Sequence, residues 1–151
     1  MADLIYRLGQ DRGSRKIARA IVENRKAGAI TTTGQLAAIV CRALGKPANS
    51  GKTRIHPATR AFQALRIAVN DELVNLEKLL DAAPELLRQN GFVAVISFHS
   101  LEDRIVKQSF KEKQRMGIYD IVTKKPITPT RDEIDRNPRA RSAKLRIARR
   151  T

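Results

Sequence analysis

The chain has 151 residues, of which 30 are lysine or arginine and 15 are aspartate or glutamate, so its net charge is +15. One domain with a hydrophobic core fits this length. The positive charge indicates a polyanionic partner, with nucleic acid favoured over an anionic membrane surface. No apolar run approaches the ~20 residues that span a bilayer, and residues 1–4 carry an acid, so we expect neither a membrane span nor a signal peptide.

Cysteine and aromatic content exclude two further classes of protein. Cys41 is the single cysteine, which excludes an internal disulfide or a cysteine zinc cluster and fits a reducing compartment. Aromatic residues make up 4% of the chain and tryptophan is absent, so a base-stacking platform is not expected. We predict a cytoplasmic protein and assign no metal ligand.

The first third of the chain has the pattern of helices. Apolar residues recur on one face of residues 17–24, which predicts a helix that Gly28 ends. Thr32 and Gln35 resemble a capping box that opens a second helix, and Gly45 is placed to end it.

A basic connection over residues 45–56 leads into the next predicted helices. Pro57 is suited to the first position of a long helix, whose apolar stripe runs from Phe62 to Leu80. A second, short helix is predicted from Pro84 to Gly91.

The most informative segment joins an apolar strand to a helix. Residues 92–98 are almost continuously apolar, which is typical of a parallel strand covered on both faces. Ser100 is placed to cap a helix that runs to about Lys113, with Asp103 near its positive end. His99 and Ser100 therefore follow the carboxyl end of the strand, where open α/β sheets bind their ligands.

Two further strands and a helix start complete the predicted elements. Residues 119–123 and 144–149 alternate as polar, edge-like strands, and residues 130–133 resemble a helix start. One strand of parallel type and two edge-like strands make an incomplete α/β sheet, so we expect strands to be missing upstream.

Four strings of residues closely resemble the small-subunit ribosomal RNA cytosine-N4 methyltransferases, the MraW or RsmH family. They are residues 54–60 (RIHPATR), 62–72 (FQALRIAVNDE), 95–106 (VISFHSLEDRIV) and 141–146 (RSAKLR). Residues 6–25 and 31–40 are similar to the second half of the helical domain inserted in that family, so the resemblance covers nearly the whole chain.

The resemblance implies a fold, an activity and a cofactor. The fold is an incomplete class I, Rossmann-like α/β methyltransferase fold: residues 1–53 correspond to part of the all-helical, substrate-recognising insert and residues 54–151 to the C-terminal part of the methyltransferase domain. The family transfers a methyl group from S-adenosylmethionine to the exocyclic amine of a cytosine in the small subunit. The implied partners are small-subunit rRNA or the ribosomal subunit, together with a separate N-terminal half.

This chain departs from the family at the cofactor site. It lacks the first four strands and their glycine-rich loop, and its eight glycines include no Gly-x-Gly. We therefore assign no cofactor-binding residue to this chain and expect it to bind no S-adenosylmethionine by itself.

His99 is the candidate catalytic residue. Its position at the end of the strand suits a proton acceptor or an RNA contact, and the alternative is a histidine hydrogen-bonded to backbone at a turn. Ser97, Ser100 and Asn70 are candidates for the wall beside the target base, although Ser100 as a helix cap and Asn70 as a buried polar crossing remain alternatives.

Basic side chains supply the candidate RNA contacts. Arg60 and Arg66 are placed to reach phosphates, or to pair with Asp71 or Glu72, or to line the interface with the missing half. The basic tail offers the candidates Arg139, Arg141, Lys144 and Arg146, with a solvated face as the alternative.

Two functions from different classes fit these observations. The first is the C-terminal part of an S-adenosylmethionine-dependent rRNA methyltransferase that is inactive by itself. The second is a non-enzymatic RNA-binding or ribosome-associated remnant of that enzyme. The presence of a cofactor-binding half elsewhere would favour the first.

Overall fold

The computed structural model describes residues 1–47 and 55–151. It divides into two compact units, Met1–Glu72 and Leu73–Thr151, which are considered separately. The predicted domain boundary between residues 53 and 54 and most of the predicted basic connection lie outside the described residues. No helix in the described ranges is long and apolar enough to cross a membrane.

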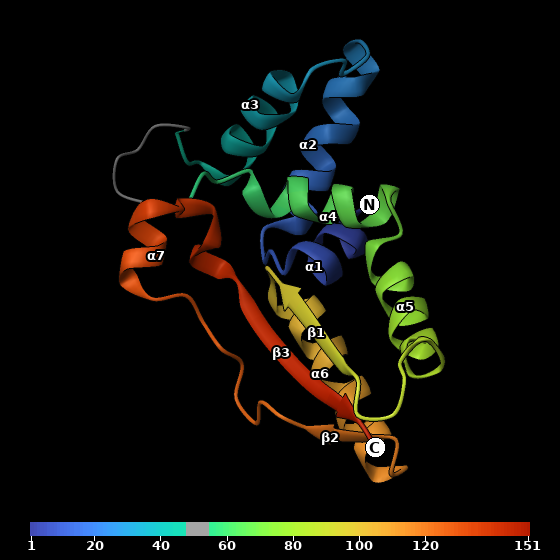
Figure 1. Ribbon diagram of the computed structural model, residues 1–151. Coiled ribbons are helices and arrows are strands. Elements are labelled where there is room, and N and C mark those ends of the chain that lie inside the picture. Colours follow the sequence, from blue (N-terminus) through green and yellow to red (C-terminus); the bar gives the residue numbers. More distant parts are fainter. Residues whose placement is uncertain (48–54) are drawn as a thin grey trace. The chain divides into compact units, whose positions relative to one another are not determined.

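Four helices form the first unit: α1 (Ala2–Gly9), α2 (Ser14–Ala27), α3 (Thr33–Leu44) and α4 (Thr59–Val69) (Figure 1). Their core is built from Ile5, Ile17, Ile21, Ile39, Val40, Ala58, Ala61 and Ala64. A Cβ at Gly9 would lie 2.5 Å from the Arg60 carbonyl oxygen, so glycine permits the close approach of α1 and α4.

Local signals set the ends of α3. The Thr32 side chain accepts a hydrogen bond from the Gln35 amide, and the Gln35 side chain accepts one from the Thr32 amide, which confirms the predicted capping box. Gly45 adopts a left-handed conformation with φ 63° and ends the helix as predicted.

The predicted long helix after Pro57 is wrong. The chain forms α4 and then α5 (Glu72–Leu86), with Asn70 at the end of α4 and Asp71 in a left-handed conformation with φ 50°. A left-handed residue interrupts the helical path, and Asn and Asp tolerate this conformation better than most side chains. Pro84 lies inside the last turn of α5 and does not open a separate helix.

The second unit combines α5 with a small sheet. Its further elements are β1 (Phe92–Ser97), α6 (Ser100–Arg115), β2 (Tyr119–Ile121), α7 (Arg131–Arg136), the short 3-10 helix η1 (Pro138–Ser142) and β3 (Lys144–Arg150). β3 is the central strand of a fully antiparallel sheet with the order β1-β3-β2, and Phe92 pairs with Arg149 at one end of β1. This mixed α/β architecture is consistent with a methyltransferase-like fragment.

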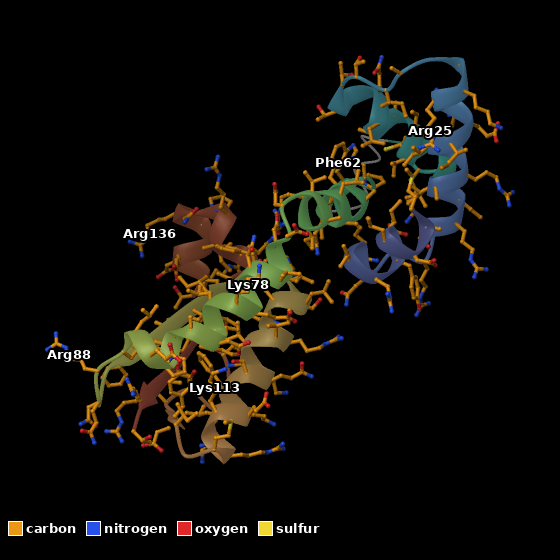
Figure 2. All side chains as sticks on the ribbon, turned by 90° about the vertical axis from the view of Figure 1, so that its right-hand side faces the viewer. Arg25, Phe62, Lys78, Arg88, Lys113 and Arg136 are labelled. Atoms are coloured by element: carbon orange, nitrogen blue, oxygen red, sulfur yellow. The ribbon has the colours of Figure 1, made fainter. Side chains whose placement is uncertain are left out.

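Helix α6 covers one face of the sheet in the second unit (Figure 1). The core between them contains Leu80, Val106, Phe110, Tyr119 and Ala148. Between α5 and α6, the Lys113 ammonium lies 3.0 Å from the Asp81 carboxylate (Figure 2).

The described residues give the strand at 92–98 neither the parallel neighbours nor the cover on both faces of which its sequence is typical. β1 pairs antiparallel with β3 and lies at the edge of the sheet. Val93 and Val95 pack against the core, whereas Phe92 and Ile96 on the opposite face are 60% and 58% exposed. The described part of the chain supplies no parallel neighbour and no second layer, so one apolar face of β1 meets solvent.

Candidate functional site

His99, at the turn between β1 and α6, is held by a reciprocal set of hydrogen bonds. Its Nδ1 accepts the Glu102 backbone N–H at 3.3 Å, while Glu102 Oε2 accepts the backbone N–H groups of Phe98 at 2.8 Å and His99 at 3.2 Å. His99 is therefore the N-cap of α6, within a capping box completed by Glu102. The prediction that Ser100 caps this helix is wrong, because α6 begins at Ser100 and the cap is one residue earlier.

The cap also fixes the proton of the His99 ring. A nitrogen that accepts a hydrogen bond carries no proton, so the neutral imidazole bears its hydrogen on Nε2. Nε2 lies 3.3 Å from the second oxygen of the Glu102 carboxylate, and the His99 side chain is only 10% exposed. The hydrogen bond at Nδ1 therefore orients the ring, as a positioned contact requires.

Asp103 connects the start of α6 to β3. Its carboxylate lies 2.7 Å from Arg146 Nε and 3.3 Å from Lys144 Nζ. The hydrogen bond from Arg146 is the main reason that the pKa of Asp103 lies below its ordinary value, and desolvation of the buried carboxyl opposes this effect. Arg146 is buried, so this ion pair fixes the helix on the sheet beside His99.

Ser97, the last residue of β1, faces the interior. It is 2% exposed, and its hydroxyl donates a weak hydrogen bond to the Lys144 carbonyl at 3.4 Å. Ser100, three residues later in the same turn, is exposed. The two serines predicted beside the target base therefore face different environments.

Three candidate residues lie in the first unit. Arg60 Nη1 donates to the Gln10 carbonyl at 3.2 Å. Arg66 forms a forked ion pair with Glu72, with nitrogen–oxygen distances of 2.6 and 2.9 Å. Asn70 Nδ2 lies 3.5 Å from the same carboxylate, so Arg66, Asn70 and Glu72 form one polar cluster at the end of α4.

Arg139 and Arg141 lie in η1, and both are exposed. Neither forms an ion pair with another described residue, unlike Lys144 and Arg146, which share Asp103. The four basic residues predicted in the tail therefore divide into an exposed pair and a pair that contributes to the fold.

The structure brings His99, Ser97, Ser100, Lys144 and Arg146 together at one end of the second unit. Sequence reasoning placed Asp103 near the positive end of the helix but missed its ion pair with Arg146, and it missed the role of Glu102 in the cap. The spacing of His99 and Glu102 matches that of a capping box with histidine in place of serine or threonine, so this signal was present.

Comparisons with known proteins identify the family of the chain. A sequence model described as the MraW methylase family matches residues 1–151. The chain belongs to the MraW methylase family. Family members named ribosomal RNA small subunit methyltransferase H are 57% identical in Acidobacterium capsulatum, 54% in Koribacter versatilis and 55% in Sorangium cellulosum, over 98%, 98% and 99% of this chain.

The chain spans about half the length of these curated relatives. The aligned regions make up 48%, 46% and 46% of the three proteins. The resemblance found in the sequence motifs is thereby confirmed at the level of the family.

Proposed function

We propose that this chain supplies the target-side part of an S-adenosylmethionine-dependent methyltransferase that acts on the N4 amine of a cytosine in small-subunit rRNA. The carrying observation is the match of its whole length to the MraW methylase family and to relatives named for methylation of small-subunit rRNA. The net charge of +15 supports a polyanionic substrate such as RNA.

The chemistry explains what the turn between β1 and α6 would contribute. An exocyclic amine is a weak nucleophile, so the enzyme must hold it in line with the methyl donor and allow its proton to leave. His99 is oriented through Nδ1, and Asp103 fixes its helix to β3. We assign His99 to contact with the target base, because the cap occupies Nδ1 and leaves the ring proton on Nε2. Ser97 and Ser100 are assigned to the surrounding wall, and Asn70, in the first unit, stays a proposed substrate-side residue.

The described residues do not fit S-adenosylmethionine itself. An adenosine-type site needs glycines at which backbone approaches the ligand, after a strand and before a helix. Gly91 precedes β1, and a Cβ there would lie 2.8 Å from the carbonyl oxygen of Arg88, so this glycine is required by its own turn. No residue of this chain is assigned to the cofactor, and these 151 residues are proposed to be inactive without a cofactor-binding part.

A non-enzymatic RNA-binding protein is the alternative. The same positive charge favours it, and so does the fact that the chain covers about half the length of its relatives. Neither observation requires a catalytic activity. The two proposals differ in whether the chain supports methyl transfer.

A mixing experiment distinguishes them. The part of the Acidobacterium capsulatum relative outside the matched region would be combined with this chain and with small ribosomal subunits that lack the methyl group. Methyl transfer from labelled S-adenosylmethionine, with N4-methylcytidine identified by mass spectrometry, is expected from the mixture and from neither part separately. RNA binding without methylation, under conditions where the intact relative is active, would favour the alternative.

A further inference from the structure

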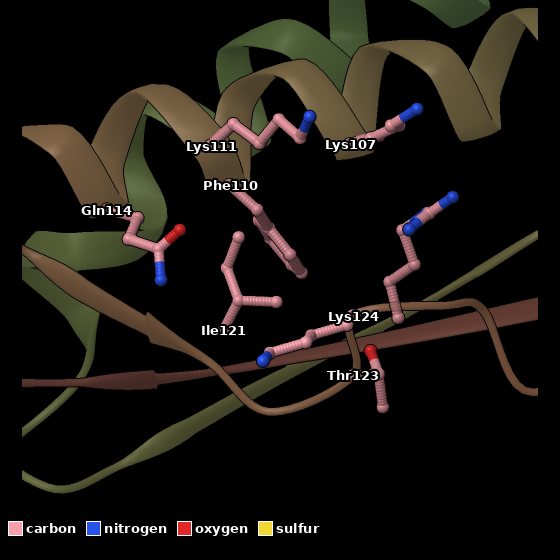
Figure 3. Close-up of a pocket in the computed structure, with 8 residues that line it drawn as sticks. Lys107, Phe110, Lys111, Gln114, Ile121, Thr123 and Lys124 are labelled. Carbon is pink, nitrogen blue, oxygen red and sulfur yellow. The ribbon is translucent and has the colours of Figure 1, made fainter.

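A pocket of about 270 Å³ opens between α6 and the end of β2 in the second unit (Figure 3). Its edge at Arg146 approaches the His99 turn through the ion pair with Asp103, whereas Phe110 is eleven residues further along the chain than His99, or about 16 Å along a helix. Its lining comes from α6, from β2 and the residues after it, and from β3: Lys107, Phe110, Lys111, Gln114, Ile121, Thr123, Lys124 and Arg146.

The rim of the pocket is positively charged and contains no acid. Lys107 and Lys111 are four residues apart on α6, so two like charges share one helix face at a cost in helix stability. Lys124 lines the opposite side of the pocket, on the segment after β2, and its side chain runs toward Ile121 (Figure 3). Arg146 is committed to Asp103, but the three lysines form no ion pair with any carboxylate in residues 1–47 and 55–151. Unneutralised charges around a concave surface focus a positive potential, which selects an anion.

The floor of the pocket is apolar and rigid. Phe110 is 2% exposed and packs edge-on against Tyr119, with ring centroids 5.8 Å apart, and Ile121 lies beside it. The Thr123 hydroxyl accepts the Ile147 backbone N–H at 2.9 Å, which fixes the wall after β2. The Gln114 amide adds a hydrogen-bond donor and acceptor at the rim.

This combination specifies the chemistry of an occupant. A suitable ligand has an anionic group that pairs with the lysines, a flat apolar part that packs on the floor, and polar edges that hydrogen-bond to Gln114. The pocket is slightly smaller than the ~300–1,000 Å³ of drug-sized ligand sites, so one nucleotide is a suitable size.

We propose that this pocket binds one nucleotide of a single-stranded RNA, with its flanking phosphates held by the rim lysines Lys107, Lys111 and Lys124 and its base against Ile121. The bound nucleotide is a different one from the base at His99. The inference rests on the proposed function for the identity of the RNA, and on the pocket itself for nucleotide recognition.

The first test measures binding of a fluorescein-labelled, ten-residue oligouridylate to the full chain over a salt series. The variant Lys107→Gln/Lys111→Gln/Lys124→Gln should reduce the log–log salt slope by about 0.7 for each lost phosphate contact on single strands. The matched control Lys78→Gln/Arg88→Gln/Arg131→Gln removes the same charge from exposed positions outside the pocket and should leave the slope nearly unchanged. Equal slopes for both triple variants would overturn the proposal.

The second test asks whether a base is recognised. Uridine monophosphate should displace the oligouridylate at lower concentration than inorganic phosphate, and Ile121→Thr, which keeps a β-branched strand residue, should abolish this preference. Photo-cross-links from 4-thiouridine in the same oligonucleotide should map to residues 107–114 and 121–124. Uridine monophosphate no better than phosphate, or cross-links confined to other segments, would overturn the nucleotide assignment.

Failure of this inference is separable from failure of the proposed function. If the pocket tests fail and the mixing experiment still gives methylation, only the pocket proposal is contradicted. RNA bound in the pocket without methylation by the mixture supports the pocket and contradicts the enzymatic proposal.

Discussion

The imidazole of His99 combines a cap on α6 with the proposed contact to the target base, and substitution can separate the two. His99→Ala should reduce single-turnover methylation by the combined parts roughly a hundredfold, and should also cost about 1 kcal/mol of stability because the N-cap is lost. Methylation rate and thermal unfolding would be measured together.

His99→Asn is the matched control, because asparagine is among the best N-caps but has no ring. It should restore stability and leave methylation low. A normal rate per folded molecule in both variants would restrict His99 to a structural role.

Asp103 should make folding stability dependent on pH in a definite direction. Its pKa is lowered in the folded state, mainly by the hydrogen bond from Arg146. The stabilisation is therefore complete above the ordinary carboxyl pKa of 3.8 and is lost as the pH falls from there through the lowered folded value.

The variant Asp103→Asn leaves the buried Arg146 without its charge partner and should cost about 3 kcal/mol at pH 7. The difference from the unmodified chain in denaturant unfolding should shrink below the ordinary carboxyl pKa. Asp120→Asn removes a more exposed ion pair with Arg149 and should cost less than about 1 kcal/mol. Equal, pH-independent effects of both variants would contradict this account.

Among the elements, β1 is expected to make the isolated chain associate. It is an edge strand with Phe92 and Ile96 exposed, and no described strand pairs with its second edge. Ile96→Lys should reduce association with little loss of stability, because this side chain points away from the core. Sedimentation velocity over a concentration series would measure it.

Leu86→Lys is the matched control for the β1 substitution, since Leu86 is 77% exposed at the end of α5 and lies outside the sheet. It should leave association unchanged. A monomeric unmodified chain at every concentration would refute the expectation.

Substitutions in the segment from η1 to β3 should distinguish residues that contact RNA from residues that stabilise the fold. Replacing Arg139 and Arg141 by Gln should lower the salt slope of single-stranded RNA binding by about 0.7 for each phosphate contact, without loss of stability. Replacing Lys144 and Arg146 should destabilise the second unit, because both contact Asp103. Unchanged salt dependence in the first variant would make η1 a solvated surface.

For the molecule as a whole, most local signals were predictable, except the cap at His99 and the break at Asp71, and the non-local pairings were not. The capping box at Thr32 and the stop at Gly45 depend on residues within one turn of helix, so the sequence contains them completely. The break at Asp71 depends on a left-handed backbone conformation, and the apolar stripe on both sides of it has the pattern of one continuous helix. The antiparallel pairing of β1 with β3 joins residues more than forty positions apart, which no local pattern specifies.

The candidate site shows the same division. The position of His99 between β1 and α6 was predictable, because a strand end and a helix start are adjacent in the sequence. The pocket was not, because Lys107, Lys111 and Lys124 have the pattern of solvated charges until α6 and the segment after β2 face each other. Arg146 resembled an RNA contact for the same reason, since its pairing with Asp103 is non-local.

The last prediction concerns the cofactor. The 151 residues by themselves should bind no S-adenosylmethionine tightly in calorimetry, because close approach of backbone to such a ligand needs closely spaced glycines after a strand. The glycines of this chain are scattered, and Gly91, beside the apolar strand, precedes it and is confined by the Arg88 carbonyl. Adding the remaining part of the Acidobacterium capsulatum relative should produce binding. Micromolar binding by the chain without that addition would show that a site of another kind exists within these residues, and would refute the assignment of the cofactor to a separate part.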